Sequence, residues 1–273
     1  MKVSMKLLMV GVALMSAIFS GCNEDDDILP DPSNTDGLVM IETGYTDAGS
    51  MKVTLYSVDS LYSRYTNLFV EVRDSATDAI IEDGHVEIMP MMQMPTMMHS
   101  APFENPSSSD AVNGLFPCAV VFQMPGEMGW SLMVHVHVNG GEGEVTFPLV
   151  VKNPEPTRTK VVIPVNDPMS RLIISYVEPL DPKVGVNDFE ITLHSRETMM
   201  SFPGIENYTV EIVPEMPSMG HGSPNNVDPT HSADGHYEGQ VNFTMTGLWR
   251  INLNIMDGST VLDSTSYFEV TLQ

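Results

Sequence analysis

The chain has 273 residues, with 12 Lys and Arg against 36 Asp and Glu, and a formal net charge of −24. Such a negative surface argues against nucleic acid and anionic membrane surfaces as partners and concentrates cations. The length suits two domains, and 2 cysteines are too few for a disulfide-stapled scaffold. The sequence has no Gly-x-Ser-x-Gly elbow, phosphate-binding glycine loop or His-Glu-x-x-His pair, so we do not expect an enzyme.

The N-terminus is typical of an export signal. Residues 1–21 contain Lys2, Lys6 and then an apolar run that is too short for a comfortable membrane span. The run ends in "IFSGC", which resembles a bacterial lipobox, so Cys22 is the expected lipid attachment point. An uncleaved N-terminal anchor is the alternative. Residues 22–37 are acidic and contain prolines, and we expect them to form a flexible tether.

Acidic residues directly behind the lipid cysteine resemble the surface-export signal of Bacteroidetes-type lipoproteins. The expected location is therefore the outer membrane, at the cell surface, and the periplasmic face is the alternative. Because Cys22 would carry the lipid, Cys118 has no partner for an intrachain disulfide. We expect Cys118 to be a buried structural thiol.

The rest of the chain contains the same series of segments twice. The motif "VEIMP" returns as "VEIVP", "MPTMMHSAP" as "MPSMGHGSP", and "GLFPCAVVFQM" as "GHYEGQVNFTM", at an offset of about 120 residues. Apolar residues alternate with polar ones in both halves, as in the runs that start at Trp130 and Trp249. Short alternating runs broken by Gly, Pro, Asn and Asp predict antiparallel strands.

The sequence thus predicts an all-β protein with two tandem immunoglobulin-like antiparallel β-sandwiches. We place the first sandwich at residues 38–151 and the second at residues 169–273. Residues 152–168 are the expected linker, since the segment is polar and is stiffened by Pro154 and Pro156.

The block shared by the two halves has a recognisable order. A strand ends in Pro and is followed by a Met-Pro-x-Met loop with His, then Gly-x-aromatic, Phe-x-Met and a Trp strand. This order resembles the YtkA-like family, related to FixH, of small exported β-sandwich domains. The second half matches over roughly residues 171–270, whereas the first has two extra loop residues and "PGEMGW" in place of "TGLW". The resemblance implies a copper-related role in or beyond the cell envelope.

The loop of the second half contains a candidate copper site. Met216, Met219 and His221 offer two thioethers and one imidazole, a neutral and soft set of donors that suits Cu(I). His231 and His236 follow, and either could swing in to serve Cu(II). The alternatives are that the methionines plug the end of the sandwich while His221 faces solvent, or that the site holds another metal.

The loop of the first half holds more methionine than packing requires, and exposed methionines would form an apolar patch that needs an explanation. A multi-sulfur Cu(I) site is one explanation, an adaptable partner-binding surface is another, and plain packing is the third. The candidate ligands in this loop are Met91, Met94, Met97, Met98 and His99.

Two further histidines, His135 and His137, share one face of a strand. Their spacing can chelate a metal, but we match them to Asn252 and Asn254 in the second half. An ordinary polar outer face is therefore the preferred interpretation. No role is assigned to His85.

The sequence as a whole predicts an exported, lipid-anchored protein that binds copper through its Met/His loops and buffers or delivers it. Its expected partners are the membrane, through the lipid on Cys22, the copper ion, and an envelope protein. The alternative is a non-catalytic cell-surface interaction module whose methionine loops contact a protein or a glycan.

Overall fold

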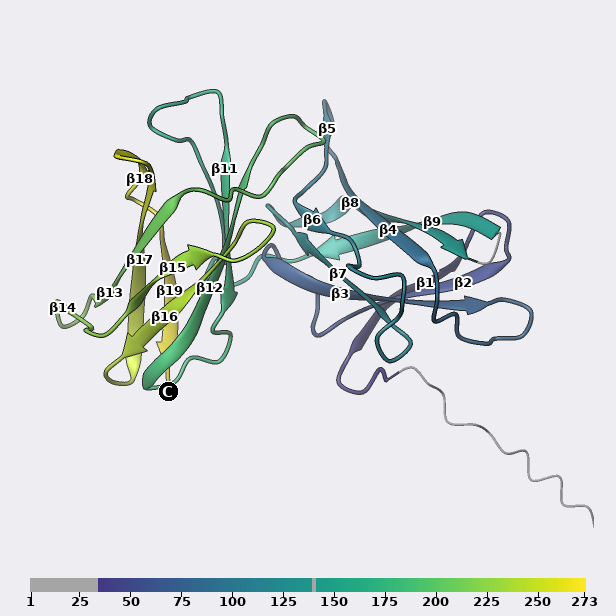
Figure 1. Cartoon of the computed structure of the whole chain (residues 1–273), viewed down its shortest axis with the longest axis horizontal. Coiled ribbons are helices and arrows are strands. Elements are labelled where there is room, and N and C mark those ends of the chain that lie inside the picture. Colours follow the sequence, from purple (N-terminus) through teal and green to yellow (C-terminus); the bar gives the residue numbers. More distant parts are fainter. Residues whose placement is uncertain (1–33, 139–140) are drawn as a thin grey trace, which may run out of the picture. The chain divides into compact units, whose positions relative to one another are not determined.

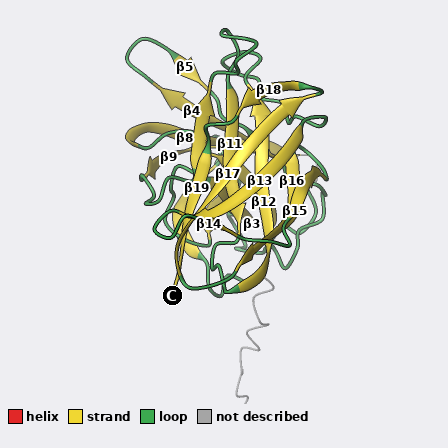
Figure 2. Cartoon of the chain, turned by 90° about the vertical axis from the view of Figure 1, so that its left-hand side faces the viewer, coloured by secondary structure: helices red, strands yellow, loops and turns green. Residues whose placement is uncertain are grey.

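The computed structural model describes residues 34–138 and 141–273. Within these ranges all regular elements are β-strands (Figures 1 and 2). The described residues contain no helix long and apolar enough to cross a membrane. The expected export signal, the lipid attachment at Cys22 and most of the tether lie outside the described residues.

The first sandwich packs two antiparallel sheets over one core. The chain crosses between the sheets, because β3 pairs with β7 and β4 pairs with β8. One sheet has the order β1(Val39–Tyr45), β2(Met51–Ser57), β3(Tyr65–Asp74), β7(Phe116–Val121) and β6(Phe103–Glu104). The other has the order β5(Met98–His99), β4(His85–Gln93), β8(Gly126–Val138) and β9(Gly141–Val151).

The second sandwich repeats this topology around a separate core. One sheet has the order β10(Thr159–Val162), β11(Leu172–Glu178), β12(Gly185–Ser195), β16(His236–Phe243) and β15(Val227–His231). The other has the order β14(His221–Gly222), β13(Thr209–Met216), β17(Gly247–Asp257) and β18(Thr260–Asp263). The last strand, β19(Tyr267–Leu272), also pairs with β17.

The prediction of two tandem immunoglobulin-like sandwiches is confirmed. Each strand pair of the first sandwich has a counterpart in the second, for example β4–β8 in β13–β17 and β3–β7 in β12–β16. The period-two pattern explains why these segments are strands, since alternate residues face the core. In β17 the inward side chains of Trp249, Ile251, Leu253 and Ile255 are all fully buried.

A buried tryptophan holds the same position in both sandwiches. The indole N–H of Trp130 donates to the Met124 carbonyl, and that of Trp249 donates to the Met245 carbonyl, both at 3.0 Å. Each ring also packs against the phenylalanine of the Phe-x-Met motif, with ring centroids 5.1 Å apart for Phe122 and 5.6 Å apart for Phe243. The tryptophan therefore fixes the turn that precedes its own strand.

The linker is shorter than the sequence predicts. Strand β10 lies inside the segment 152–168, and it pairs with β11 at the edge of the second sandwich. The Thr159 hydroxyl is 3.0 Å from the Ser175 hydroxyl in a buried hydrogen bond. Four residues followed shortly by Pro164 are too short a run for the period-two pattern to reveal.

We expect a fragment of residues 157–273 to unfold cooperatively and a fragment of residues 164–273 to be markedly less stable. Removal of β10 breaks its ladder with β11 and takes the Thr159 hydroxyl away from the Ser175 hydroxyl. Urea titration followed by tryptophan fluorescence compares the midpoints. Equal midpoints would show that β10 is dispensable.

Candidate functional site

Strand β4, which leads into the first methionine loop, points its side chains alternately into the core and out of it. In β4 the even positions, including Ile88 and Met92, are buried, whereas Met89 is exposed and Met91 is half-buried on the outer side. Met91 is paired with Ser131 on β8. Because the strand fixes these directions, Met91 cannot turn to the same side as Met92.

The turn after β4 brings three of the predicted ligands together. Met94, Met97 and His99 line one cavity of about 160 Å³, next to Gln123. The turn is closed by a hydrogen bond from the Met94 N–H to the Met97 carbonyl at 2.9 Å. Met98 is half exposed and does not line this cavity.

His99 is held in one tautomer. Its ring is buried, and Nδ1 lies 2.7 Å from the Ser100 carbonyl oxygen. A carbonyl oxygen only accepts, so Nδ1 carries the proton and the neutral ring keeps a lone pair on Nε2. The ring also stands edge-on to Trp130, with centroids 5.8 Å apart. Metal-binding histidines are usually oriented by a hydrogen bond from the ring nitrogen that does not bind the metal, and the His99 ring is held in this way.

The second sandwich completes the wall of this cavity. Arg196, Met199 and Phe202, from the loop after β12, line it together with the first loop. The Ser100 N–H donates to the Met199 carbonyl at 2.8 Å, which ties the two loops. The thioether of Met199, in a side chain that is 40% exposed, is a candidate donor that the sequence analysis missed. The pair "MM" at 199–200 was its only signal.

The structure places Met216 in the core. It is 3% exposed, and a Cβ built on Gly247 would lie 3.1 Å from its Cε atom. Gly247 has a φ of +120°, which a side chain would also strain. In the first sandwich Met92, 7% exposed, packs in the same way beside Gly129. Met92 is the counterpart of Met216, because the ladders pair Met92 with His99 and Met216 with His221.

The other two candidates of the second loop do not join Met216 in a site. Met219 is 62% exposed in the turn, whereas Met216 is buried beneath it. His221 pairs with Met216 across the β13–β14 ladder and stands edge-on to Trp249, with centroids 5.6 Å apart. Two thioethers facing one side, as the spacing suggested, are not found here.

His231 and His236 lie at the other end of their sheet. His236 begins β16 and is paired with Thr192, whereas the strand ends at Phe243 beside Trp249. His231 pairs with Tyr237. The expectation that either one serves the loop of His221 is not supported, because a strand of this length separates them.

His236 instead joins two carboxylates. Its Nε2 is 2.9 Å from Glu104 of the first sandwich, and its Nδ1 contacts Glu190 of the second. The Tyr65 hydroxyl donates to Glu104 at 3.1 Å, and the Tyr65 ring stands edge-on to His236. Burial lowers the pKa of His236, but the hydrogen bonds to Glu104 and Glu190 outweigh it and raise the pKa to about 9.

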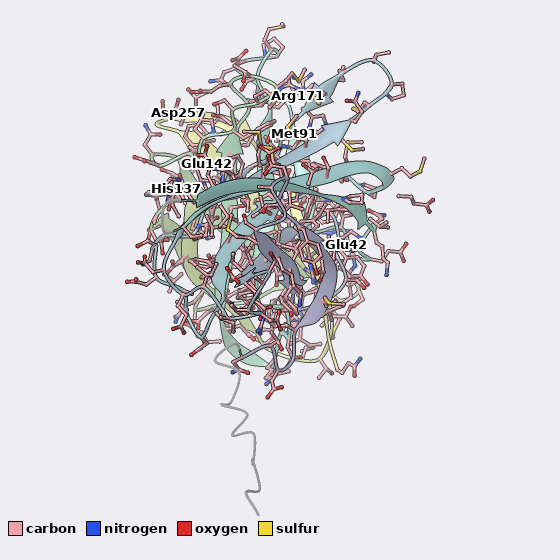
Figure 3. The ribbon with its side chains drawn as sticks, turned by 90° about the vertical axis from the view of Figure 1, so that its right-hand side faces the viewer. Glu42, Met91, His137, Glu142, Arg171 and Asp257 are labelled. Carbon is pink, nitrogen blue, oxygen red and sulfur yellow. The ribbon has the colours of Figure 1, made fainter. Side chains whose placement is uncertain are left out.

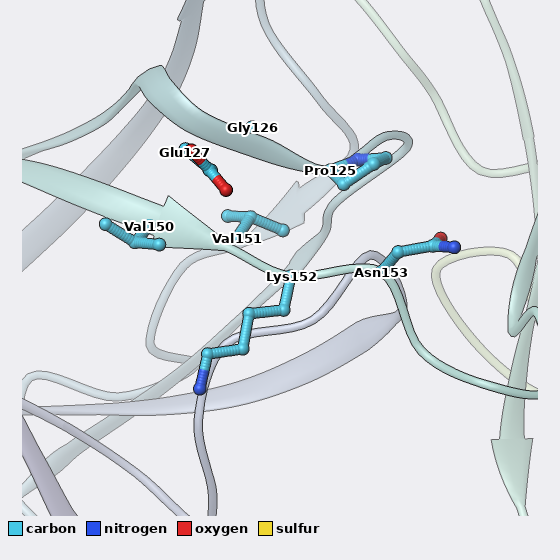
Figure 4. A pocket seen from close by; sticks show the side chains of 7 residues that line it. All are labelled: Pro125, Gly126, Glu127, Val150, Val151, Lys152 and Asn153. Carbon is cyan, nitrogen blue, oxygen red and sulfur yellow. The ribbon is translucent and has the colours of Figure 1, made fainter.

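Other parts of the described chain offer less. Cys118 is a buried free thiol, as expected, and burial raises its pKa. Among residues 34–138 and 141–273, no three His, Cys, Asp or Glu side chains are arranged to hold a metal ion. A larger cavity of about 720 Å³ opens beside Lys152 and Glu127, but neither methionine nor histidine lines it (Figure 4).

Comparison with known proteins identifies one segment. Residues 173–254 match the YtkA-like family model. The YtkA-like segment lies entirely within the second sandwich and includes its Met/His loop. No curated protein matches the chain.

Several solved structures resemble the chain. Domains 5–6 of the S-layer protein SbsC are 12% identical with a TM-score of 0.30, and the match covers 86% of this chain and 97% of that one. The Escherichia coli adhesin FdeC is 15% identical with a TM-score of 0.26, covering 85% and 65%. Invasin, a bacterial integrin-binding protein, is 14% identical with a TM-score of 0.26, covering 81% and 39%. The chain thus spans less than two thirds of FdeC and of invasin.

We expect the His236 contacts to stabilise the protein most below pH 6.5 and to lose their effect as the pH rises through about 9. A folded-state pKa above the unfolded value means that the folded protein holds the proton more tightly, by at most about 3 kcal/mol. Thermal unfolding of wild type and His236→Gln, compared between pH 6 and pH 10, measures this. The gap between them should close at high pH, and a constant gap would contradict the assignment.

Proposed function

We propose that the protein binds Cu(I) in the cavity lined by Met94, Met97 and His99, and that it buffers or delivers copper in the cell envelope. The observation that carries the proposal is that these three side chains, all capable of soft or borderline coordination, line one small cavity. Cu(I) tolerates low coordination numbers and favours thioether sulfur, so two or three thioethers with one imidazole form a suitable set.

Three features favour a metal over plain packing at this place. In the neutral form of the His99 ring, the hydrogen bond from Nδ1 to the Ser100 carbonyl leaves the lone pair on Nε2. Met97 and Met199 are 45% and 40% exposed, so neither side chain is packed into a hydrophobic core. Met199 adds a third thioether from a separate segment of the chain.

Arg196 acts against the ion. Arg196 lines the same cavity, and a positive charge near the donors lowers the affinity for any cation. The neutral donors do not compensate for this repulsion. The arrangement fits a site that releases copper readily, as delivery requires.

The cellular setting is part of the proposal. The lipobox-like "IFSGC" and the acidic residues after Cys22 favour a lipoprotein of the outer membrane, at the cell surface or on the periplasmic face. We take both sandwiches as copies of one exported, FixH-related domain with a non-catalytic role. The YtkA-like match of residues 173–254 and the internal repeat in the sequence favour this assignment. An envelope protein would receive or supply the copper.

The alternative is a non-catalytic interaction surface. Met97, Met98, Met199 and Met200 are all between 40% and 50% exposed. Exposed methionines adapt their shape to varied partners, so this patch could contact a protein or a glycan.

Cu(I) titration against a competing chelator distinguishes the two functions. We expect Met94→Leu/Met97→Leu to weaken binding by at least about tenfold and Met199→Leu by less, because leucine keeps volume but offers no sulfur. Met219→Leu is the matched control, since this exposed methionine lies outside the cavity, and it should bind as wild type does. Equal binding by all four proteins, or none by wild type, would leave the interaction surface as the better function.

A change at Arg196 should raise the Cu(I) affinity, whereas the methionine variants should lower it. Arg196→Gln removes the positive charge and keeps a polar side chain of similar length, so the Cu(I) affinity should rise severalfold. The same titration, repeated at low and high salt, measures the effect. An affinity that falls would mean that Arg196 supports the site rather than opposing the ion.

A further inference from the structure

The outer face of the first sandwich gathers histidines and carboxylates from three adjacent strands. The register pairs His85 with His137 and Glu87 with His135 across β4 and β8. Across β8 and β9 it pairs His137 with Glu142. The side chains of these five residues point away from the core, because the positions that alternate with them along each strand are the buried ones.

Several of these side chains already contact one another. The Nε2 atom of His85 is 3.1 Å from Oε1 of Glu87, and Nδ1 of His135 is 3.9 Å from Oε2 of the same carboxylate. His137 lies beside Glu142, with Nδ1 and Oε2 3.9 Å apart (Figure 3). The Glu87 carboxylate thus stands between the imidazoles of His85 and His135. The imidazole of His137 is on the residue directly opposite His85 in the ladder.

We infer that this face binds a borderline divalent ion such as Zn(II) through His85 and His137, with Glu87 or His135 as a further ligand. Residues directly opposite on paired strands have Cβ atoms about 4.5–5.5 Å apart. Two imidazoles at that separation can each place a nitrogen about 2.0–2.1 Å from a shared zinc ion. Imidazole and carboxylate are ligands that Zn(II) accepts, whereas thioether is not.

Binding needs only side-chain rotation. As the described residues stand, no three such groups converge on one point. The side chains of His85 and His137 are 65% and 58% exposed, so no packing holds them in their present rotamers. Water can fill the remaining coordination positions, and the acidic charge of the chain raises the local concentration of cations.

The second sandwich supplies a natural control. Its register pairs Thr209 with Met256 and Glu211 with Asn254, so these residues are the counterparts of His85, His137, Glu87 and His135. This corrects the sequence-based match of His135 and His137 to Asn252 and Asn254. The Asn254 amide still contacts Glu211, at 3.4 Å. Both sandwiches thus have a glutamate paired with a polar residue, Glu87 with His135 and Glu211 with Asn254. The pair of opposed histidines, His85 and His137, is found in the first sandwich and is replaced by Thr209 and Met256 in the second.

Calorimetric titration of Zn(II) into the purified chain tests the site. We expect wild type to bind one ion, and His85→Thr/His137→Met, which installs the residues of the second sandwich, to bind at least about tenfold more weakly. Both positions are exposed, so the variant should fold, which circular dichroism checks. Excess Ca(II) should not displace Zn(II), because calcium prefers oxygen ligands.

The reverse exchange completes the test. Thr209→His/Met256→His should add a second Zn(II) site, since the register and the neighbouring Glu211 are already present. Zn(II) binding that is absent in wild type, or unchanged in His85→Thr/His137→Met, would overturn the inference. The outcome is independent of the copper proposal, because the Met94→Leu/Met97→Leu variant should bind Zn(II) as wild type does.

Discussion

The hydrogen bond from a buried indole to a methionine carbonyl organises the loop end of each sandwich. Trp130 holds the turn at Met124 and also presents its ring to the edge of His99. Trp249 does the same for Met245 and His221. Because the indole is buried, its N–H must find an acceptor, and this requirement fixes the turn, the strand and the neighbouring imidazole together. The Met/His loops depend on this support.

Strand parity then decides what each methionine can do. Within β4 a methionine is either in the core, as Met92 is, or on the outer side, as Met91 is. Only after the strand ends can neighbouring methionines turn toward one place, and Met94 and Met97 follow it directly. In the second sandwich the turn is two residues shorter, and its one methionine beyond the strand, Met219, is alone and exposed. The two loops share a scaffold but differ in their supply of sulfur.

The fold could be predicted from the sequence because period-two alternation and an internal repeat can both be read from the order of the residues without any knowledge of their contacts. The site could be predicted only in part. The first loop contains Met-Pro twice, at 89–90 and 94–95, so the repeat aligns in two ways and only the β-ladder identifies Met92 as the counterpart of Met216. Met199 reaches the cavity from a distant part of the chain, and the contact between Glu104 and His236 spans 132 positions, so no local pattern reveals either. Strand β10 has only 4 residues, which is too short for a period-two pattern to be recognised in the sequence.

At the two proposed sites, selectivity among cations of equal charge must come from the ligand atoms, because the acidic surface attracts such cations alike. Arg196 adds a distinction by charge. Coulomb repulsion scales with the charge of the ion, so Arg196 disfavours a divalent ion about twice as strongly as Cu(I) in the same cavity. On the outer face of the first sandwich the neighbours of His85 and His137 are carboxylates, and there the sign is reversed in favour of a divalent ion. The thioethers beside Arg196 would thus favour the monovalent Cu(I), and the imidazoles beside Glu87 and Glu142 would favour a divalent ion.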